Sequence, residues 1–285
     1  MPIEAFCGIP TASLHFLNVA RREGSPLLMS ANAFWRNGRF RGYEILWDIE
    51  VPFALDSSGF VAMRRYGGYR WSIFDYVELA TTLRPLWWAA MDYCCEPEIS
   101  SNQQQVTQRV ENTIYSLAKT IATVAAWNRE LPGWPATPPI PVIQGWKPSD
   151  YRYCIAKMQD CLFGDPAYAE AMGHDGWPSL VGVGSVCRRQ LSGESGLMRV
   201  IDTLEGNLPA NVHFHLFGVK STALSKLKDR PRISSVDSMA WNSGARWQAY
   251  KTNRSKGKAF LSAKMEQWVI SQKRRTIQSP QLSLL

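Results

Sequence analysis

Three aspartates and a glutamine each follow a short apolar run of the chain, where a strand of a sheet would end. They are Asp56 after residues 52–55, Asp92 after residues 86–91, Gln144 after residues 139–143 and Asp237 after residues 232–236. One carboxylate can act as a nucleophile, a second can move a proton, and a third with an amide can read the hydrogen-bonding edge of a ligand. The pattern predicts an active site built on carboxylates. For Asp56 alone, an alternative is that it only caps the following turn.

Small and aromatic residues stand at similar positions. Two further apolar runs end in Gly184-Ser185 and in Phe217-Gly218, and Phe60 comes shortly after the first aspartate. Glycine at a strand end lets a ligand approach backbone N–H groups. The two phenylalanine rings are suited to stack on the faces of a flat ligand.

Strands and helices are predicted to alternate along the chain. The strand candidates are residues 14–20, 26–35, 52–56, 86–92, 139–145, 179–186, 211–218 and 232–238. Helices are predicted at residues 71–83, 103–130, 150–162, 166–172, 196–205, 222–227 and 259–272. Alternation favours an α/β fold with a parallel sheet, and eight units favour a closed (β/α)8 TIM-like barrel. A doubly wound open sheet is the alternative, although no GxGxxG turn follows the first strand.

The composition indicates a folded protein with a basic C-terminal quarter. Of the 285 residues, 45% are hydrophobic and twelve are tryptophan, which excludes a disordered chain. From Lys220 onward, fourteen Lys and Arg oppose three acidic residues, so the net charge is +11 there and −3 in the rest of the chain, from a total of +8. We expect residues 1–246 to form the barrel and residues 247–285 a basic extension packed on it. The residues expected to hold a nucleic-acid backbone are Arg246, Lys251, Arg254, Lys256 and Lys258.

The cysteines and histidines do not form a recognisable metal motif. The six cysteines have no CxxC spacing, and none of the four histidines pairs with a cysteine at zinc-site spacing. We therefore expect no cofactor, and a zinc site would need residues distant in sequence. No apolar run reaches the roughly 18 residues that cross a bilayer, and the start Met1-Pro2-Ile3-Glu4 lacks the basic character of a signal peptide. We expect a cytoplasmic protein without a membrane partner.

The strand-end motifs resemble, in order, those of the tRNA-guanine transglycosylase family. The matching motifs are Leu55-Asp56-Ser57-Ser58-Gly59-Phe60, Met91-Asp92, Val142-Ile143-Gln144-Gly145, Val183-Gly184-Ser185, Leu216-Phe217-Gly218 and Val236-Asp237-Ser238. The resemblance extends from about residue 26 to residue 246. It implies base exchange, in which guanine leaves a polynucleotide and a free 7-deazaguanine base takes its place.

The resemblance also implies a role for each matching residue. Asp237 would attack C1′ of the sugar and form a covalent glycosyl-enzyme, and Asp56 would be the general acid and base. Asp92 would accept from N1–H and the 2-amino group, while Gln144 and the Gly184 N–H would donate to O6. The remaining substrate-binding residues of these motifs are Gly145, Ser185 and Gly218, with Phe60 and Phe217 stacking on the ring faces.

Two departures from the family indicate a particular branch. Relatives that act on tRNA carry a cysteine-rich zinc site after the nucleophile, whereas no cysteine follows Cys187 here. Where bacterial relatives have an acidic residue that suits an aminomethyl cation, this chain has Cys187-Arg188-Arg189, which favours a neutral base such as 7-cyano-7-deazaguanine. The chain is therefore most similar to the phage and bacterial branch that inserts 7-deazaguanines into DNA, with DNA as the partner in a bacterial or phage-infected cytoplasm.

Other functions stay open at this point. One is exchange in tRNA by a relative without the zinc module, and another is a non-catalytic nucleic-acid-binding subunit of the same superfamily. The third is a carbohydrate-cleaving barrel with the same two carboxylates. The oligomeric state and the recognised DNA motif do not follow from the sequence.

Overall fold

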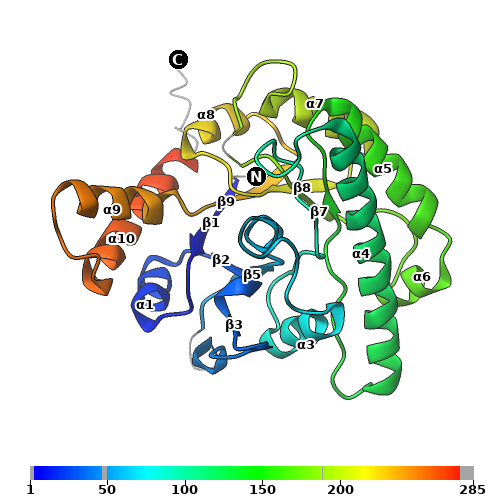
Figure 1. Cartoon of the computed structure of the whole chain (residues 1–285), viewed down its shortest axis with the longest axis horizontal. Coiled ribbons are helices and arrows are strands. Elements are labelled where there is room, and N and C mark those ends of the chain that lie inside the picture. The colour runs from blue at the N-terminus through cyan, green and yellow to red at the C-terminus, as the bar shows by residue number, and fades with distance from the viewer. Residues whose placement is uncertain (1–2, 47–49, 188, 277–285) are drawn as a thin grey trace, which may run out of the picture.

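A computed structural model describes residues 3–46, 50–187 and 189–276 of the chain. At its centre lies a curled parallel sheet of seven strands, in the order β5-β2-β1-β9-β8-β7-β6, with helices around the outside (Figure 1). The strands are β1 (Glu4–Ile9), β2 (Leu27–Ser30), β5 (Phe53–Asp56), β6 (Val142–Ile143), β7 (Leu180–Val183), β8 (His213–Leu216) and β9 (Ile233–Ser238). This arrangement confirms the predicted α/β class. The last nine residues of the expected extension, 277–285, lie outside the described residues, as do Met1 and Pro2 at the start of the expected barrel.

The two edge strands of the sheet approach each other through the segment 87–90. Leu55 of β5 pairs in parallel with Trp88, and Ala89 pairs in parallel with Ile140, just before β6. The Ala89 N–H donates to the Leu55 carbonyl at 2.9 Å, and the Ile140 N–H donates to the Trp88 carbonyl at 2.8 Å. In addition, the first strand, β1, pairs with the last, β9. These pairings are consistent with a TIM-like architecture.

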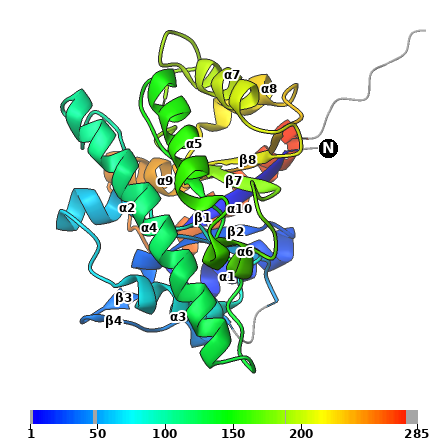
Figure 2. The same cartoon turned by 90° about the vertical axis from the view of Figure 1, so that its right-hand side faces the viewer.

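The helices cover the outer face of the sheet (Figures 1 and 2). Their first turns follow local signals: Ser72 and Asp75 form a capping box at α3, and the Asn102 side chain accepts from the Gln105 N–H at the start of α4. The helices are α1 (Leu14–Glu23), α2 (Gly59–Val61), α3 (Ile73–Leu83), α4 (Gln103–Glu130), α5 (Pro148–Leu162), α6 (Pro166–Met172), α7 (Leu197–Asn207), α8 (Leu224–Leu227), α9 (Ala240–Lys251) and α10 (Lys258–Thr276).

Apolar side chains fill both faces of the sheet. The main core lies between the strands and the helices and contains large buried side chains such as Leu17, Leu55 and Tyr151. A smaller cluster of Phe6, Leu28 and Ala54 packs against Trp87 and Phe217. Burial on both faces explains why the strands read as continuous apolar runs. It also fixes the positions of the strand ends that carry the polar residues.

One strand prediction is wrong and another strand was missed. Residues 14–20 belong to helix α1, which buries Phe16, Leu17, Val19 and Ala20 on one face and ends at Gly24 with φ 53°. The strand prediction rested on the apolar run and overlooked this 3.6-residue spacing. The first strand is β1 instead. Residues 86–92 form only the two isolated bridges in place of a regular strand.

Two further elements were absent from the prediction. A hairpin joins β3 (Trp35–Arg36) to β4 (Arg39–Phe40), and its turn residues Asn37 and Gly38 have φ values of 51° and 76°. An Asn-Gly pair is the usual signal for such a turn. Helix α9 also went unpredicted, and the expected domain boundary after residue 246 falls within it.

Candidate active site

The polar residues at the strand ends surround one cavity of about 220 Å³. It lies at the carboxyl ends of the strands, where enzymes with parallel α/β sheets place their chemistry. Its volume is below the roughly 300–1,000 Å³ of pockets for drug-sized ligands and suits a small flat molecule. The residues predicted for the site that line it are Asp56, Phe60, Asp92, Gln144, Gly184, Ser185, Phe217, Gly218 and Asp237.

Asp56, the last residue of β5, is half-buried at this cavity. The Ser30 hydroxyl, at the end of the neighbouring strand β2, donates to its Oδ2 at 2.9 Å. Burial and the negative charges of Asp92 and Asp237 raise the pKa of Asp56 to about 7, although the hydrogen bond from Ser30 opposes the shift. A carboxyl group with this pKa can both give and take a proton at neutral pH.

Asp237 enters the same cavity from β9 and is 7% exposed. The Gly218 N–H, at the end of β8, donates to its Oδ1 at 2.7 Å. Gly218 has φ 69°, and a Cβ there would lie 2.8 Å from Cys187 Sγ, so only glycine fits without strain. His215 Nε2 lies 3.4 Å from the same Oδ1. The carboxylate is thus held in place by the backbone of an adjacent strand end.

Asp92 and Gln144, which lie between Asp56 and Asp237 in the sequence, form a buried hydrogen-bonded pair. Gln144 Nε2 donates to Asp92 Oδ2, and the Ser57 hydroxyl donates to Asp92 Oδ1 at 2.7 Å. Burial raises the pKa of Asp92, while the hydrogen bonds from Ser57 and Gln144 oppose the rise. The hydroxyl of Ser185 donates to Gln144 Oε1 at 2.7 Å. The pair therefore presents a fixed set of donors and acceptors to the cavity.

Gly184 and Gly145 of the motifs lie in tightly packed positions. The Gly184 N–H donates to the Ile143 carbonyl at 3.0 Å, so it already has a partner within the sheet and is not directed at a ligand. A Cβ at Gly184 would overlap the Gln144 side chain. Gly145 lies outside the residues that line the cavity, and a Cβ there would come within 2.8 Å of Asp150 Cβ at the start of α5. Both glycines therefore allow close packing beside the site.

Phe60 and Phe217 border the cavity from different elements. Phe60 lies on the short helix α2 and is 37% exposed. Phe217 follows β8, packs against Trp87 and His215, and lies so close to Gly182 that a Cβ there would be 2.6 Å from its ring. One ring is therefore fixed by packing, while the other faces solvent and has room to adjust to a ligand.

The cavity contains residues that sequence reasoning missed. Ser30 carries the same strand-end signal as Asp56, and Glu96 follows Asp92 by four residues.

Arg189, which was expected to influence the incoming base, is 7% exposed and donates to the carbonyls of Ser185, Trp146 and Ser195. It therefore holds the loop after β7. Arg188 lies outside the described residues.

The basic residues predicted to contact nucleic acid are exposed on α9, on the loop to α10 and at the first residue of α10. Helix α9 begins directly after β9 (Figure 1). It therefore leaves the sheet at the carboxyl end of β9, where Asp237 lines the cavity. Two aromatic rings stand among the cations: Trp247 is 60% exposed and Tyr250 is 79% exposed. The Lys251 ammonium lies 3.9 Å from the centre of the Trp247 ring. The predicted residues are Arg246, Lys251, Arg254, Lys256 and Lys258.

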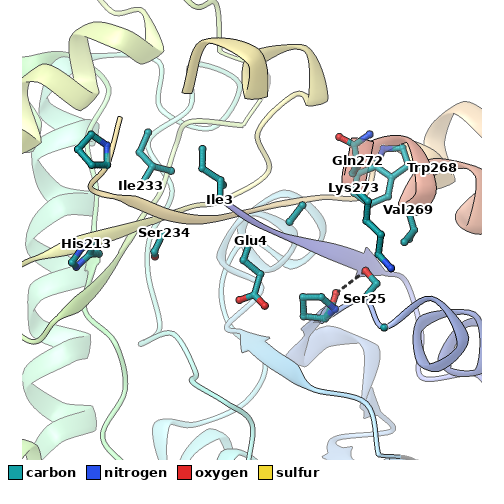
Figure 3. Close-up of a pocket in the computed structure, with 14 residues that line it drawn as sticks. Ile3, Glu4, Ser25, His213, Ile233, Ser234, Trp268, Val269, Gln272 and Lys273 are labelled. Atoms are coloured by element: carbon teal, nitrogen blue, oxygen red, sulfur yellow. Dashed lines mark hydrogen bonds between the residues drawn. The ribbon is translucent and has the colours of Figure 1, made fainter. Parts of the chain in front are cut away.

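A second, larger cavity of about 610 Å³ lies at the amino ends of the strands, beside α10 (Figure 3). It is bordered by Glu4, His213 and Trp268 among mostly apolar or backbone groups. The smaller cavity is the candidate active site, because of these two cavities it is the one that collects several carboxyl groups. In the part of the chain that the structure describes, no His, Cys, Asp and Glu side chains gather in a metal-binding group of three or more. Nor does any described helix combine the length and apolarity needed to cross a bilayer.

Comparison with known proteins identifies a family. A family model described as "DpdA: DeoxyPurine in DNA protein A" matches residues 13–283, which is most of the chain. No curated protein matches the sequence significantly. The matched region includes every strand-end residue described above. The chain therefore belongs to the DpdA family, whose members are tRNA-guanine transglycosylase-like enzymes that modify DNA with 7-deazaguanines.

Proposed function

We propose that this protein replaces guanine in DNA with a 7-deazaguanine through a covalent aspartyl-glycosyl intermediate. The observation that carries the proposal is that Asp56 and Asp237, 181 residues apart in the sequence (237 − 56), line one small cavity together with Asp92 and Gln144. We also propose that the sheet closes through residues 87–90 into a (β/α)8 barrel. A closed barrel brings all strand ends to one rim, which supports a shared active site for these residues.

In the first half of the reaction, an Asp237 oxygen attacks C1′ of the deoxyribose and forms a C–O bond. The C1′–N9 bond breaks, its electron pair leaves with guanine, and Asp56 supplies the proton that neutralises the leaving base. The pKa of Asp56 near 7 supports this role, because the group is substantially protonated at neutral pH. The backbone N–H of Gly218 keeps Asp237 oriented for attack.

In the second half, the incoming base loses its N9 proton to Asp56, which is now ionised. The base nitrogen attacks C1′, the bond to Asp237 breaks, and both aspartates return to their starting states. One carboxyl group therefore shuttles a single proton between the two bases, and no other acid or base is required.

The buried pair would recognise the base. Asp92 accepts from N1–H and the 2-amino group, and the second N–H of Gln144 donates to O6, since its first is used by Asp92. We expected the Gly184 N–H to share the contact with O6, but its bond to Ile143 favours Gln144 as the donor. Phe60 and Phe217 would stack on the two faces of the ring.

DNA would reach this cavity only with the target nucleotide flipped out of the duplex, which costs a few kcal/mol. The basic residues of α9 and the following loop would offset part of this cost by contacts with phosphates, with Trp247 and Tyr250 as exposed stacking surfaces. For the incoming base we propose the neutral 7-cyano-7-deazaguanine, because the buried guanidinium of Arg189 beside the Ser185 carbonyl disfavours a cationic substituent.

Mass spectrometry of nucleosides tests the proposal. DNA and, separately, tRNA are incubated with the protein and 7-cyano-7-deazaguanine, digested and analysed. We expect the modified deoxynucleoside in DNA and an equivalent amount of released guanine, with neither product from an Asp237→Asn variant. Modification of tRNA alone would refute DNA as the substrate. Product formation by the Asp237→Asn variant at the wild-type rate would refute the covalent mechanism.

A further inference from the structure

Glu96 is a buried carboxyl group that the proposed chemistry does not use. It lines the active-site cavity and is 7% exposed. Its Oε2 lies 3.0 Å from the hydroxyl oxygen of Ser185. None of the salt bridges among the described residues includes it. A carboxyl group in this position needs an explanation, because burying it without a cation is costly.

Glu96 is one end of a chain of four hydrogen-bonded side chains, with Asp92 at the other end. From Asp92 the chain runs through the Gln144 amide and the Ser185 hydroxyl to Glu96. The Cys95 N–H also donates to the Ser185 hydroxyl oxygen, at 2.7 Å. Two carboxyl groups are thus connected through one amide and one hydroxyl.

Once the protonation state of Asp92 is set, the number of available protons determines the direction of every bond in this chain. If Asp92 is ionised and accepts from Gln144 Nε2, then Gln144 Oε1 faces Ser185 and needs a donor. The Ser185 hydroxyl has only one proton, and donating it to Gln144 leaves none for Glu96. Glu96 must then carry a proton of its own and donate to Ser185. With Asp92 ionised, this direction leaves each of the three bonds with one donor.

The opposite direction is also consistent, but it presents a different surface to a ligand. A protonated Asp92 would donate to a turned amide, Gln144 would donate to Ser185, and Ser185 would donate to an ionised Glu96. The cavity would then show an amide oxygen where the first arrangement shows an N–H. The first arrangement complements O6 and N1–H of a 6-oxo purine, and the second complements the 6-amino group of a 6-aminopurine.

We propose that Glu96 is a positioning residue which, as a neutral acid, donates to Ser185, holds the Gln144 amide with its N–H toward the base, and so makes the pocket selective for 6-oxo over 6-amino purines. This inference rests on the proposed function of the site. Burial raises the pKa of Glu96, although the hydrogen bond from its own N–H opposes the rise, and the direction agrees with a neutral side chain.

Binding of free bases tests the inference without requiring catalysis. Dissociation constants for guanine and for 2,6-diaminopurine, which differ at position 6 and N1, are measured by titration calorimetry for the wild type and for Glu96→Gln, Glu96→Leu and Ser185→Ala. Glu98→Leu, at an exposed position two residues away, is the matched control. Melting temperatures establish which variants fold.

The wild type, Glu96→Gln and Glu98→Leu should all prefer guanine, because a glutamine side chain can also donate to Ser185. In Glu96→Leu and Ser185→Ala the preference should fall by about tenfold, the effect of losing one orienting hydrogen bond. If Glu96→Leu does not fold, Glu96→Gln and Ser185→Ala make the same comparison.

Two results would overturn this inference and leave the proposed function standing. The first is an unchanged preference for guanine in Glu96→Leu or in Ser185→Ala. The second is a loss of the preference for guanine in Glu96→Gln, which would mean that an ionised carboxylate is needed. A wild-type protein that binds neither base would instead contradict the purine site of the proposed function and the inference with it.

Discussion

Replacing Asp56 with asparagine should inactivate the protein and stabilise it above neutral pH. The folded protein raises the pKa of this carboxyl from 3.8 to about 7, which corresponds to about 4 kcal/mol against its ionised form. Because the side chain is half-buried beside an open cavity, solvent screening makes this an upper limit, and we expect about 2 kcal/mol. The stability of the wild type should therefore fall as the pH rises from about 4 to 7.

Asparagine cannot ionise, so the variant escapes this loss. Relative to the wild type, Asp56→Asn should gain about 2 kcal/mol at pH 8, a rise in melting temperature of about 4 °C or more, and much less at pH 5. Guanine release should slow by roughly 10²–10⁴-fold, the usual contribution of a general acid. In the wild type, release should decline about tenfold per pH unit above pH 7, as the acid form of Asp56 is lost.

The assays are thermal unfolding at pH 5 and pH 8 and guanine release from DNA across the same range. Asp160→Asn, at an exposed position on α5, is the matched control and should alter neither property. The reasoning is refuted if Asp56→Asn shows the same stability change between the two pH values as the wild type. Full activity of the variant would equally refute Asp56 as the proton donor.

Three other variants, one of them a double substitution, test separate parts of the proposed function. The wild type should form a covalent protein–DNA adduct that is detectable on denaturing gels, and Asp237→Ala should abolish it. An adduct that persists in this variant would place the nucleophile elsewhere. Gly59→Ala should weaken guanine binding at least about tenfold, because the new Cβ would lie 2.6 Å from the carbonyl oxygen and from Oδ1 of Asp92. The matched control is Gly206→Ala on α7, whose new Cβ meets no atom within 4 Å and should leave guanine binding unchanged. Replacing Arg254 and Lys256 together with glutamine should reduce the log–log slope of DNA affinity against salt concentration by about 0.9 for each phosphate that these side chains neutralise, and an unchanged slope would exclude them from the interface.

Much of the helical structure could be read from the sequence. The boundaries of α4 and α6 agree with the prediction to the residue, because both helices have polar N-caps and clear stop signals. Residues 14–20 were mistaken for a strand because a ten-residue helix offers few turns over which to recognise its period. The strand β1 was missed because a short apolar run near a terminus carries no distinctive pattern.

The candidate site was predictable to the extent that its residues stand at strand ends. Asp56, Asp92, Gln144 and Asp237 share that position, and the structure brings all four to one cavity. Glu96 follows no strand and carries no such signal, so its place beside Ser185 depends on how the loop after residue 92 packs.

The amino-acid sequence by itself determined the alternation of elements, the identity of the strand-end residues and the basic character of the C-terminal quarter, because these depend on local pattern and composition. Only the tertiary structure decided which groups meet: that the Gly184 N–H is taken by Ile143, that Glu96 joins Ser185, and that the pKa of Asp56 rises to about 7. Hydrogen-bond partners and burial depend on contacts between segments distant in the chain, and side-chain spacing along one segment carries no information about them.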